Sequence, residues 1–208
     1  ITTMTSFDII ALLPEMVLTL TGVALMMLAA FYKDGATRWC STVALLGLSG
    51  ATAAVIYGRH FPGLVYGGMF SVDPFGRYFR LLFYLIAALV TLASVDYLNR
   101  ERLAAGEYFA LLLFATIGMD LMASANDLIL IFIGLEISSL SSYVLVGFRR
   151  DAPNSSESAL KYFLLGSFAT AFLLYGIALL FGVTGSTRLT QIRAVLRGGQ
   201  TPMSASAP

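Results

Sequence analysis

The sequence predicts an all-α membrane protein: a polytopic helix bundle with about six transmembrane helices and a short amphipathic surface helix. Apolar residues make up 58% of the 208 residues and charged residues only 12%, roughly half the charged fraction of a typical soluble domain. The mean hydropathy is +0.81. Apolar runs long enough to cross a bilayer follow one another with short polar breaks between them, so there is too little polar sequence to cover the helices in water.

Each apolar run is long enough to cross about 30 Å of hydrocarbon at about 1.5 Å per residue. The expected spans are 10–32, 40–57, 74–98, 107–125, 128–148 and a sixth run that ends near 182. Lys33, Asp34 and Gly35 end the first run. Pro74 suits the first turn of a helix, and Asp127 is a good N-cap for the fifth span. Ser155 or Ser156 is the expected cap of the sixth.

Beyond Gly185 the sequence changes character. Leu189, Ile192 and Leu196 recur at helical spacing among arginines, which predicts an amphipathic helix over 187–196 on the membrane surface. The small polar residues 200–208 are expected to be disordered. We therefore divide the chain into three helices over 1–98, helices four to six over 99–185, and an amphipathic segment with a tail over 186–208.

Several chemistries are not expected in this chain. The net charge of +1 gives no reason to expect nucleic-acid binding. A single cysteine excludes an intrachain disulfide and a cysteine-rich metal or iron–sulfur site. The single histidine, His60, stands beside Arg59 in a loop, where solvation is the usual state. Residues 1–8 lack a basic n-region, so the first run is interpreted as a helix of the mature protein and not as a signal peptide.

Glu136 is the main anomaly, because it lies near the middle of the fifth apolar run. A charged group at that depth costs about 2.5–3.5 kcal/mol on insertion scales, so it must face protein or water. Ser139 and then Ser142 or Tyr143 follow on the same helical face and form a polar stripe with it. Intramembrane acids usually mark ion or proton paths. The alternative is a neutral, hydrogen-bonded acid that only joins helices.

Lys161 is a natural partner for Glu136, because spans five and six form an antiparallel pair. Counting from the loop between them predicts a depth difference of about 7 Å. A buried pair of this kind could exchange a proton when a nearby charge moves. The alternative is an ion pair between Lys161 and Glu157, which stand four residues apart at the membrane edge.

The remaining charged residues near the spans are weaker candidates. Asp120, in span four, is interpreted equally well as a functional residue or as a polar group near the surface. Glu15, in the first turn of span one, is expected to be solvated and favoured by the helix dipole. Arg77 and Arg80 lie close enough to the start of span three to reach the interface with their head groups.

Two motifs resemble a known family. The segment from Ser155 to Gly166, SSESALKYFLLG, and the segment from Leu121 to Leu128 with Gly134-Leu135-Glu136 strongly resemble the subunit N family of bacterial NADH–quinone oxidoreductase, respiratory complex I. Leu13-Pro14-Glu15 and Val72-Asp73-Pro74-Phe75 fit the early helices of that family. The resemblance runs from about residue 12 to residue 189 and covers the amino-terminal part of the family pattern.

The resemblance implies an antiporter-like subunit that moves protons across the bacterial inner membrane, driven by quinone reduction elsewhere in the complex. It implies that Glu136 and Lys161 belong to the proton path, with Asp120, Glu157, Ser139 and Tyr143 as further possible members. NADH, flavin, iron–sulfur clusters and quinone would belong to other subunits, so no cofactor or metal is expected in this chain. The implied partners are the other membrane subunits and the lipid bilayer.

The family continues into a broken seventh helix with another lysine, which is not present in these 208 residues. The resemblance implies a periplasmic amino terminus. The loop charges favour the same orientation. Each side of the membrane has six basic residues, but on one side all six lie in short loops. Two other functions stay open at this point, namely a subunit of a related multisubunit cation/proton antiporter and a purely structural or assembly helix bundle.

Overall fold

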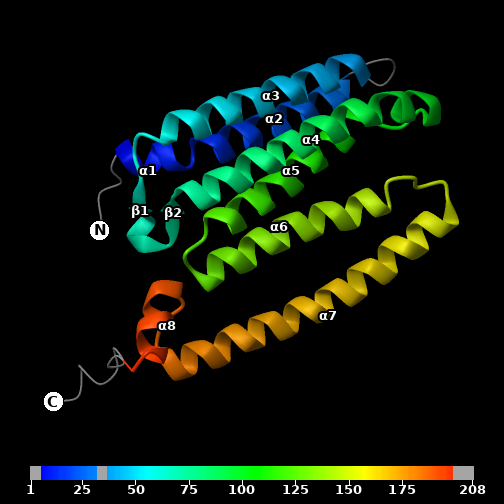
Figure 1. Cartoon of the computed structure of the whole chain (residues 1–208). Helices are drawn as coiled ribbons and strands as arrows, with labels where there is room; N and C mark the ends of the chain where they lie inside the picture. The colour runs from blue at the N-terminus through cyan, green and yellow to red at the C-terminus, as the bar shows by residue number, and fades with distance from the viewer. Residues whose placement is uncertain (1–5, 32–36, 199–208) are drawn as a thin grey trace.

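The computed structural model describes residues 6–31 and 37–198, which form eight α-helices and one small hairpin (Figure 1). The helices are α1 (Ser6–Ala11), α2 (Leu13–Phe31), α3 (Thr37–Gly58), α4 (Pro74–Glu101), α5 (Ala105–Ser124), α6 (Leu128–Val146), α7 (Pro153–Thr184) and α8 (Leu189–Leu196). The expected break at 33–35 and the expected disorder of 200–208 lie outside the described residues.

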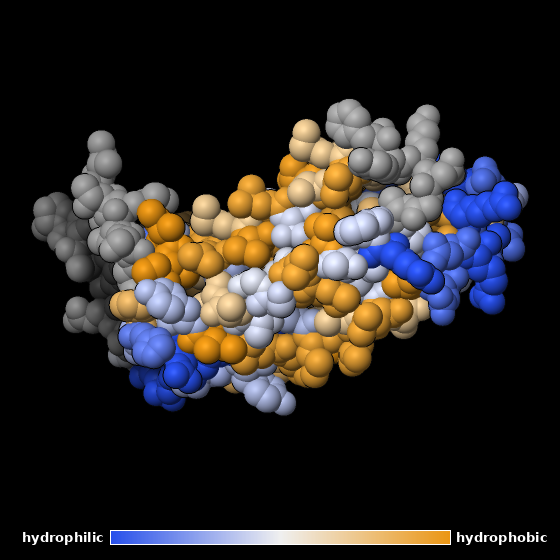
Figure 2. Space-filling view, turned by 90° about the horizontal axis from the view of Figure 1, so that it is seen from above, coloured by the Kyte–Doolittle hydropathy of each residue, from blue (hydrophilic) through white to orange (hydrophobic). Residues whose placement is uncertain are grey.

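The predicted fold class is confirmed. Five helices, α3 to α7, are long and apolar enough to cross a membrane, and α2 carries a shorter apolar stretch, Leu13–Ala29. Figure 2 shows the matching surface, with hydrophilic residues gathered toward both ends and a broad hydrophobic band between them. Helix α8 carries the predicted amphipathic pattern and buries Ile192.

Helices α2 to α5 enclose the main core, where Leu18, Leu25, Phe109 and Leu113 are fully buried. Helix α5 packs against α2, α3, α4 and α6 and is the centre of the bundle. Helix α7, in contrast, packs mainly against α6 and buries little of its apolar surface.

Helices α5 and α6 approach each other closely through two glycines. A methyl group at Gly134 would lie 2.7 Å from the carbonyl oxygen of Gly118. A methyl group at Gly118 would meet the Gly134 carbonyl and the Ser138 amide in the same way. Small residues of this kind let membrane helices pack backbone to backbone.

The loop between α3 and α4 contains structure that the sequence did not predict. Strands β1 (Gly63–Val65) and β2 (Phe70–Val72) pair antiparallel around the short 3₁₀ turn Tyr66–Gly68. Phe70, the first residue of β2, is buried. The strands are too short to show an alternating pattern, so only their contacts with α1 and with the ends of α4 and α5 specify them.

The helix ends confirm the predicted cap at Asp127, add a cap at Asp73 that was not predicted, and correct the cap expected for the sixth span. Asp73 accepts a hydrogen bond from the Gly76 amide at 2.6 Å, and Asp127 accepts one from Ile129 at 2.9 Å. The prediction that Ser155 or Ser156 caps the sixth span was wrong. Helix α7 begins at Pro153 with Ala152 as its N-cap, since a proline in the first turn needs no amide partner.

Candidate functional site

Glu136 lies on α6, and Tyr143 lies two turns further along the same face of that helix. The helix packs its Gly134 face against α5, so the Glu136 side of the helix points away from α5. The Oε1 atom of Glu136 is buried and has no hydrogen-bond partner among the described residues. A buried carboxyl oxygen without a hydrogen-bond donor destabilises the folded state. Packing alone therefore does not explain why an acid stands at this position.

Tyr143 joins this face of α6 to α7. Its hydroxyl packs directly against Gly166, and its ring meets those of Tyr162 and Phe163 edge-on at centroid distances of 4.8 and 5.7 Å. Tyr143 itself is buried, at 8% exposure. The hydroxyl is therefore a polar group held between the two helices.

Lys161 does not contact Glu136. Its Nζ donates to Glu157 Oε1 at 2.5 Å, and both side chains are largely exposed in this chain. The alternative interpretation, an ion pair four residues apart on one helix, is therefore the geometry that the structure has.

The register of α6 against α7 explains why the direct pair does not form. Tyr143 lies beside Gly166, and Gly147 lies beside Ala159. These contacts leave about nine residues of α7 between Lys161 and the level of Glu136, or about 14 Å along the axis. The depth difference of about 7 Å expected from the sequence was too small, because α7 begins at Pro153 and its first turns extend past the end of α6.

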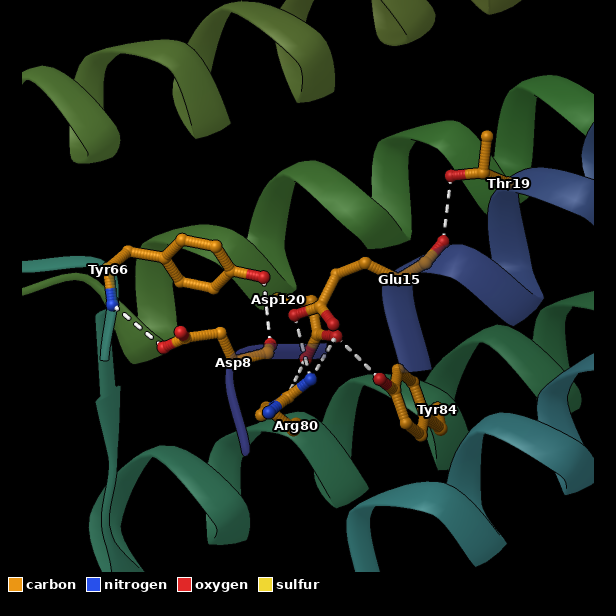
Figure 3. Close-up of polar contacts among 7 residues, drawn as sticks. All are labelled: Asp8, Glu15, Thr19, Tyr66, Arg80, Tyr84 and Asp120. Atoms are coloured by element: carbon orange, nitrogen blue, oxygen red, sulfur yellow. Dashed lines mark hydrogen bonds and ion pairs between the residues drawn. The ribbon is translucent and has the colours of Figure 1, made fainter. Parts of the chain in front are cut away.

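A second group of charged residues lies inside the bundle. Arg80 of α4 donates from Nη2 to Glu15 Oε1 at 2.7 Å, and from Nε and Nη2 to the two oxygens of Asp120 at 2.8 and 3.2 Å. Tyr84 donates its hydroxyl to Asp120 Oδ2 at 2.5 Å. Figure 3 shows these side chains converging from α2, α4 and α5. We call Glu15, Arg80, Tyr84 and Asp120 the Arg80 cluster.

The Arg80 cluster corrects three expectations. Glu15 is 6% exposed and Arg80 5%, so the predictions of a solvated acid and of an arginine that reaches the interface were wrong. Asp120 is fully buried, so it is not a surface group. The two carboxyl groups hold the guanidinium inside the bundle through hydrogen bonds, so its head group does not extend to the interface.

One signal in the sequence could have identified the Arg80 cluster. Arg80 lies six residues after the start of α4 at Pro74, and Asp120 lies four residues before the end of α5 at Ser124. The two ends lie on the same side of the bundle, so the opposite charges are at similar depth. Pairing opposite charges that lie at similar depth in neighbouring spans would have predicted the contact between Arg80 and Asp120.

The hairpin covers the cluster from the loop side. The Phe70 ring lies 5.6 Å from the Arg80 guanidinium carbon. The Tyr66 hydroxyl donates to the Asp8 carbonyl at 2.8 Å, which ties the hairpin to α1. Burial raises the pKa of the Tyr66 hydroxyl, and the negative charge of Asp8 raises it further.

Comparison with known proteins identifies related chains. A family described as NADH:quinone oxidoreductase/Mrp antiporter, TM, matches residues 125–206. NADH-quinone oxidoreductase subunit N 2 of Koribacter versatilis is 44% identical over 200 residues, covering 92% of this chain and 41% of that protein. Subunit N of Trichlorobacter lovleyi is 41% identical over 185 residues, covering 89% and 38%. The chain thus spans about 40% of the length of the curated relatives it matches.

Two solved structures have similar folds. A chain of respiratory complex I from Thermus thermophilus with bound aureothin is 35% identical, with a TM-score of 0.69 over 85% of this chain and 38% of that one. A chain of the archaeal membrane-bound sulfane sulfur reductase has a TM-score of 0.70 over 89% of this chain and 39% of that one. Its identity is 20%, so it supports the fold alone.

Proposed function

Because the chain belongs to the family of antiporter-like membrane subunits that includes subunit N of NADH–quinone oxidoreductase, we propose that it translocates protons in the membrane arm of such a complex. Quinone reduction in other subunits would drive the movement. No redox step is assigned to this chain, and its partners would be the other membrane subunits of the complex.

The observation that carries this proposal is the state of Glu136. A carboxyl group with a buried, unpartnered oxygen in an apolar helix can take up and release a proton with little rearrangement of its surroundings. Glu136 also falls within the residues that match the family. A merely structural acid would be expected to find a donor within the bundle.

The geometry favours a stepwise path over a direct exchange between Glu136 and Lys161. Coulomb coupling across about 14 Å is weak where water and ions reach one partner, as they would at an exposed lysine. Tyr143 lies between their levels, with its hydroxyl against α7, and Ser139 follows Glu136 on the same face. We propose that a proton passes between the Glu157–Lys161 pair and Glu136 by way of Tyr143 and Ser139.

A related cation/proton antiporter is the second candidate, because the description of the matched family covers Mrp antiporters as well. Identity of 44% to a subunit N favours the respiratory complex. For the same reason we propose the bacterial inner membrane as the location, with the amino terminus on the periplasmic side.

Purification of the full-length protein from its native membrane separates the two candidates. The proposal expects it to co-purify with flavin- and iron–sulfur-containing subunits, and expects NADH to drive proton uptake in vesicles that contain the complex. Recovery without those subunits, together with proton movement that follows an imposed Na⁺ gradient, would instead identify an antiporter.

A further inference from the structure

The charges of the Arg80 cluster do not balance if both acids are ionised. Glu15 and Asp120 would carry two negative charges against the single positive charge of Arg80, and all three residues are at most 6% exposed. One nitrogen, Arg80 Nη2, contacts both carboxyl groups. Two carboxylates that share a buried site do not both ionise readily, because each disfavours the charge of the other.

The hydrogen bonds distinguish the two acids. Asp120 accepts three, from Arg80 Nε, from Arg80 Nη2 and from the Tyr84 hydroxyl. Glu15 accepts only one from a side chain, on Oε1, and its Oε2 is buried with no partner among the described residues. Donors stabilise a carboxylate, so the negative charge belongs on Asp120 and the unpartnered oxygen belongs to the acid that can carry a proton.

We propose that the Arg80 cluster is a proton-binding site, in which Glu15 carries one exchangeable proton on Oε2 beside an ionised Asp120–Arg80 pair. The charged and titratable groups that face Glu15 include Arg80 and Tyr84 from α4, Asp120 from α5 and Tyr66 from the hairpin. With the proton bound the cluster is neutral, and without it the cluster carries one net negative charge.

A small cavity connects the Arg80 cluster with the loops. It has a volume of about 20 Å³ and is lined by Pro14, Arg80 and Ser124 on the inner side and by Arg59, Ser71 and Asp73 toward the loops. Ser124 is 2% exposed, and its Oγ is also without a hydrogen-bond partner among the described residues. A cavity of this size has room for about one water molecule between Arg80 and the loop side.

This site is separate from Glu136. Asp120 lies on the side of α5 opposite to Gly118, and Gly118 packs against Gly134 of α6. The α5 backbone therefore lies between Asp120 and Glu136. The inference does not rest on the proposed function, because proton binding by Glu15 can be measured without any proton pumping.

Infrared spectroscopy of the assembled complex tests the proposal, because a protonated carboxyl group has a carbonyl band that a carboxylate lacks. Spectra of the wild type are compared with those of Glu15→Gln, in samples with and without ¹³C-carboxyl glutamate. The expected result is the loss of absorption from one protonated carboxyl in Glu15→Gln at neutral pH, with the lost band sensitive to labelled glutamate. Glu107→Gln, at a partly exposed glutamate that pairs with Arg150, is the control and keeps this band.

Asp120→Asn gives a second measurement that does not depend on Glu15→Gln being assembled. It removes the competing carboxylate and leaves Glu15 alone with Arg80, so Glu15 should ionise and the same glutamate band should disappear. Unchanged protonated-carboxyl absorption in either variant would overturn the proposal.

Discussion

At the scale of single residues, the fully buried Asp120 and the half-buried Glu136 have different surroundings. Asp120 is bound by a guanidinium and a phenol, whereas the Oε1 of Glu136 is buried without a donor in the described part of the chain. The first arrangement supplies donors that stabilise a carboxylate, whereas the second leaves the carboxyl oxygen without a donor. The difference supports Glu136 as the working residue of the path and Asp120 as a fixed charge.

Tyr143→Phe tests the stepwise path at this scale. The variant keeps the ring contacts with Tyr162 and Phe163 but removes the hydroxyl beside Gly166. We expect assembly to be unchanged and NADH-driven proton uptake in vesicles to fall by at least about tenfold, as for loss of a proton-transferring group. Tyr162→Phe, which removes a hydroxyl from an exposed tyrosine of the same ring cluster, is the control. Equal uptake by both variants would remove Tyr143 from the path.

The sequence identified Glu136 because it was alone in an apolar run, but it did not identify the partner groups. Arg80 was interpreted by its distance from a helix start, which could not reveal that two acids from other helices meet it. Lys161 was assigned two possible partners, and the choice depended on the register of α6 against α7, which Gly166 and Gly147 set through contacts with Tyr143 and Ala159.

At the scale of helices, hydropathy predicted the spans but not how they pack. The thickness of the bilayer sets the length of each apolar run, so length and composition were enough to predict the spans. The close contact of α5 with α6 depends instead on single glycines, and the sequence contains nineteen of them. The hairpin over 63–72 was missed for a related reason, because its three-residue strands exist through contacts with α1, α4 and α5.

Gly118→Ala tests the close contact of α5 with α6. The added methyl group would meet backbone atoms of Gly134 and Ser138, which cannot move aside as a flexible side chain can. Overpacking of this kind costs about 1–3 kcal/mol, so we expect a lower melting temperature of the full-length subunit in detergent. Gly58→Ala is the matched control, because a methyl group there meets no atom within 4 Å. A melting temperature equal to that of the control would show that the two helices are not held this closely.

At the scale of the whole molecule, one junction joins segments far apart in the sequence. Asn126, in the turn between α5 and α6, donates from its backbone to Met69 and from Nδ2 to Gly68, while its carbonyl accepts from Leu189. Asp127 accepts from the Thr187 hydroxyl at 2.7 Å. The junction places the hairpin, the start of α6 and α8 at one end of the bundle (Figure 1). It connects the first three spans with the segment that matches the family.

Asn126→Ala tests whether this junction holds the segments together. The variant leaves the Gly68 carbonyl without its side-chain donor at a partly buried site, and loss of one hydrogen bond costs about 0.5–1.5 kcal/mol. We expect faster hydrogen–deuterium exchange at the amides of Leu128 and Leu189, which bond across the junction. Asn154→Ala, at an exposed residue of the first turn of α7, is the control. Unchanged exchange at both amides would mean that the segments stay together without Asn126.

Glu136→Gln in the assembled complex tests whether Glu136 carries protons. Glutamine keeps the size of the side chain but cannot release a proton, so the experiment records proton uptake by vesicles together with NADH oxidation. We expect pumping to be lost while the complex remains assembled. Proton uptake and NADH oxidation equal to those of the wild type would contradict this expectation and leave Glu136 as an acid that only joins helices.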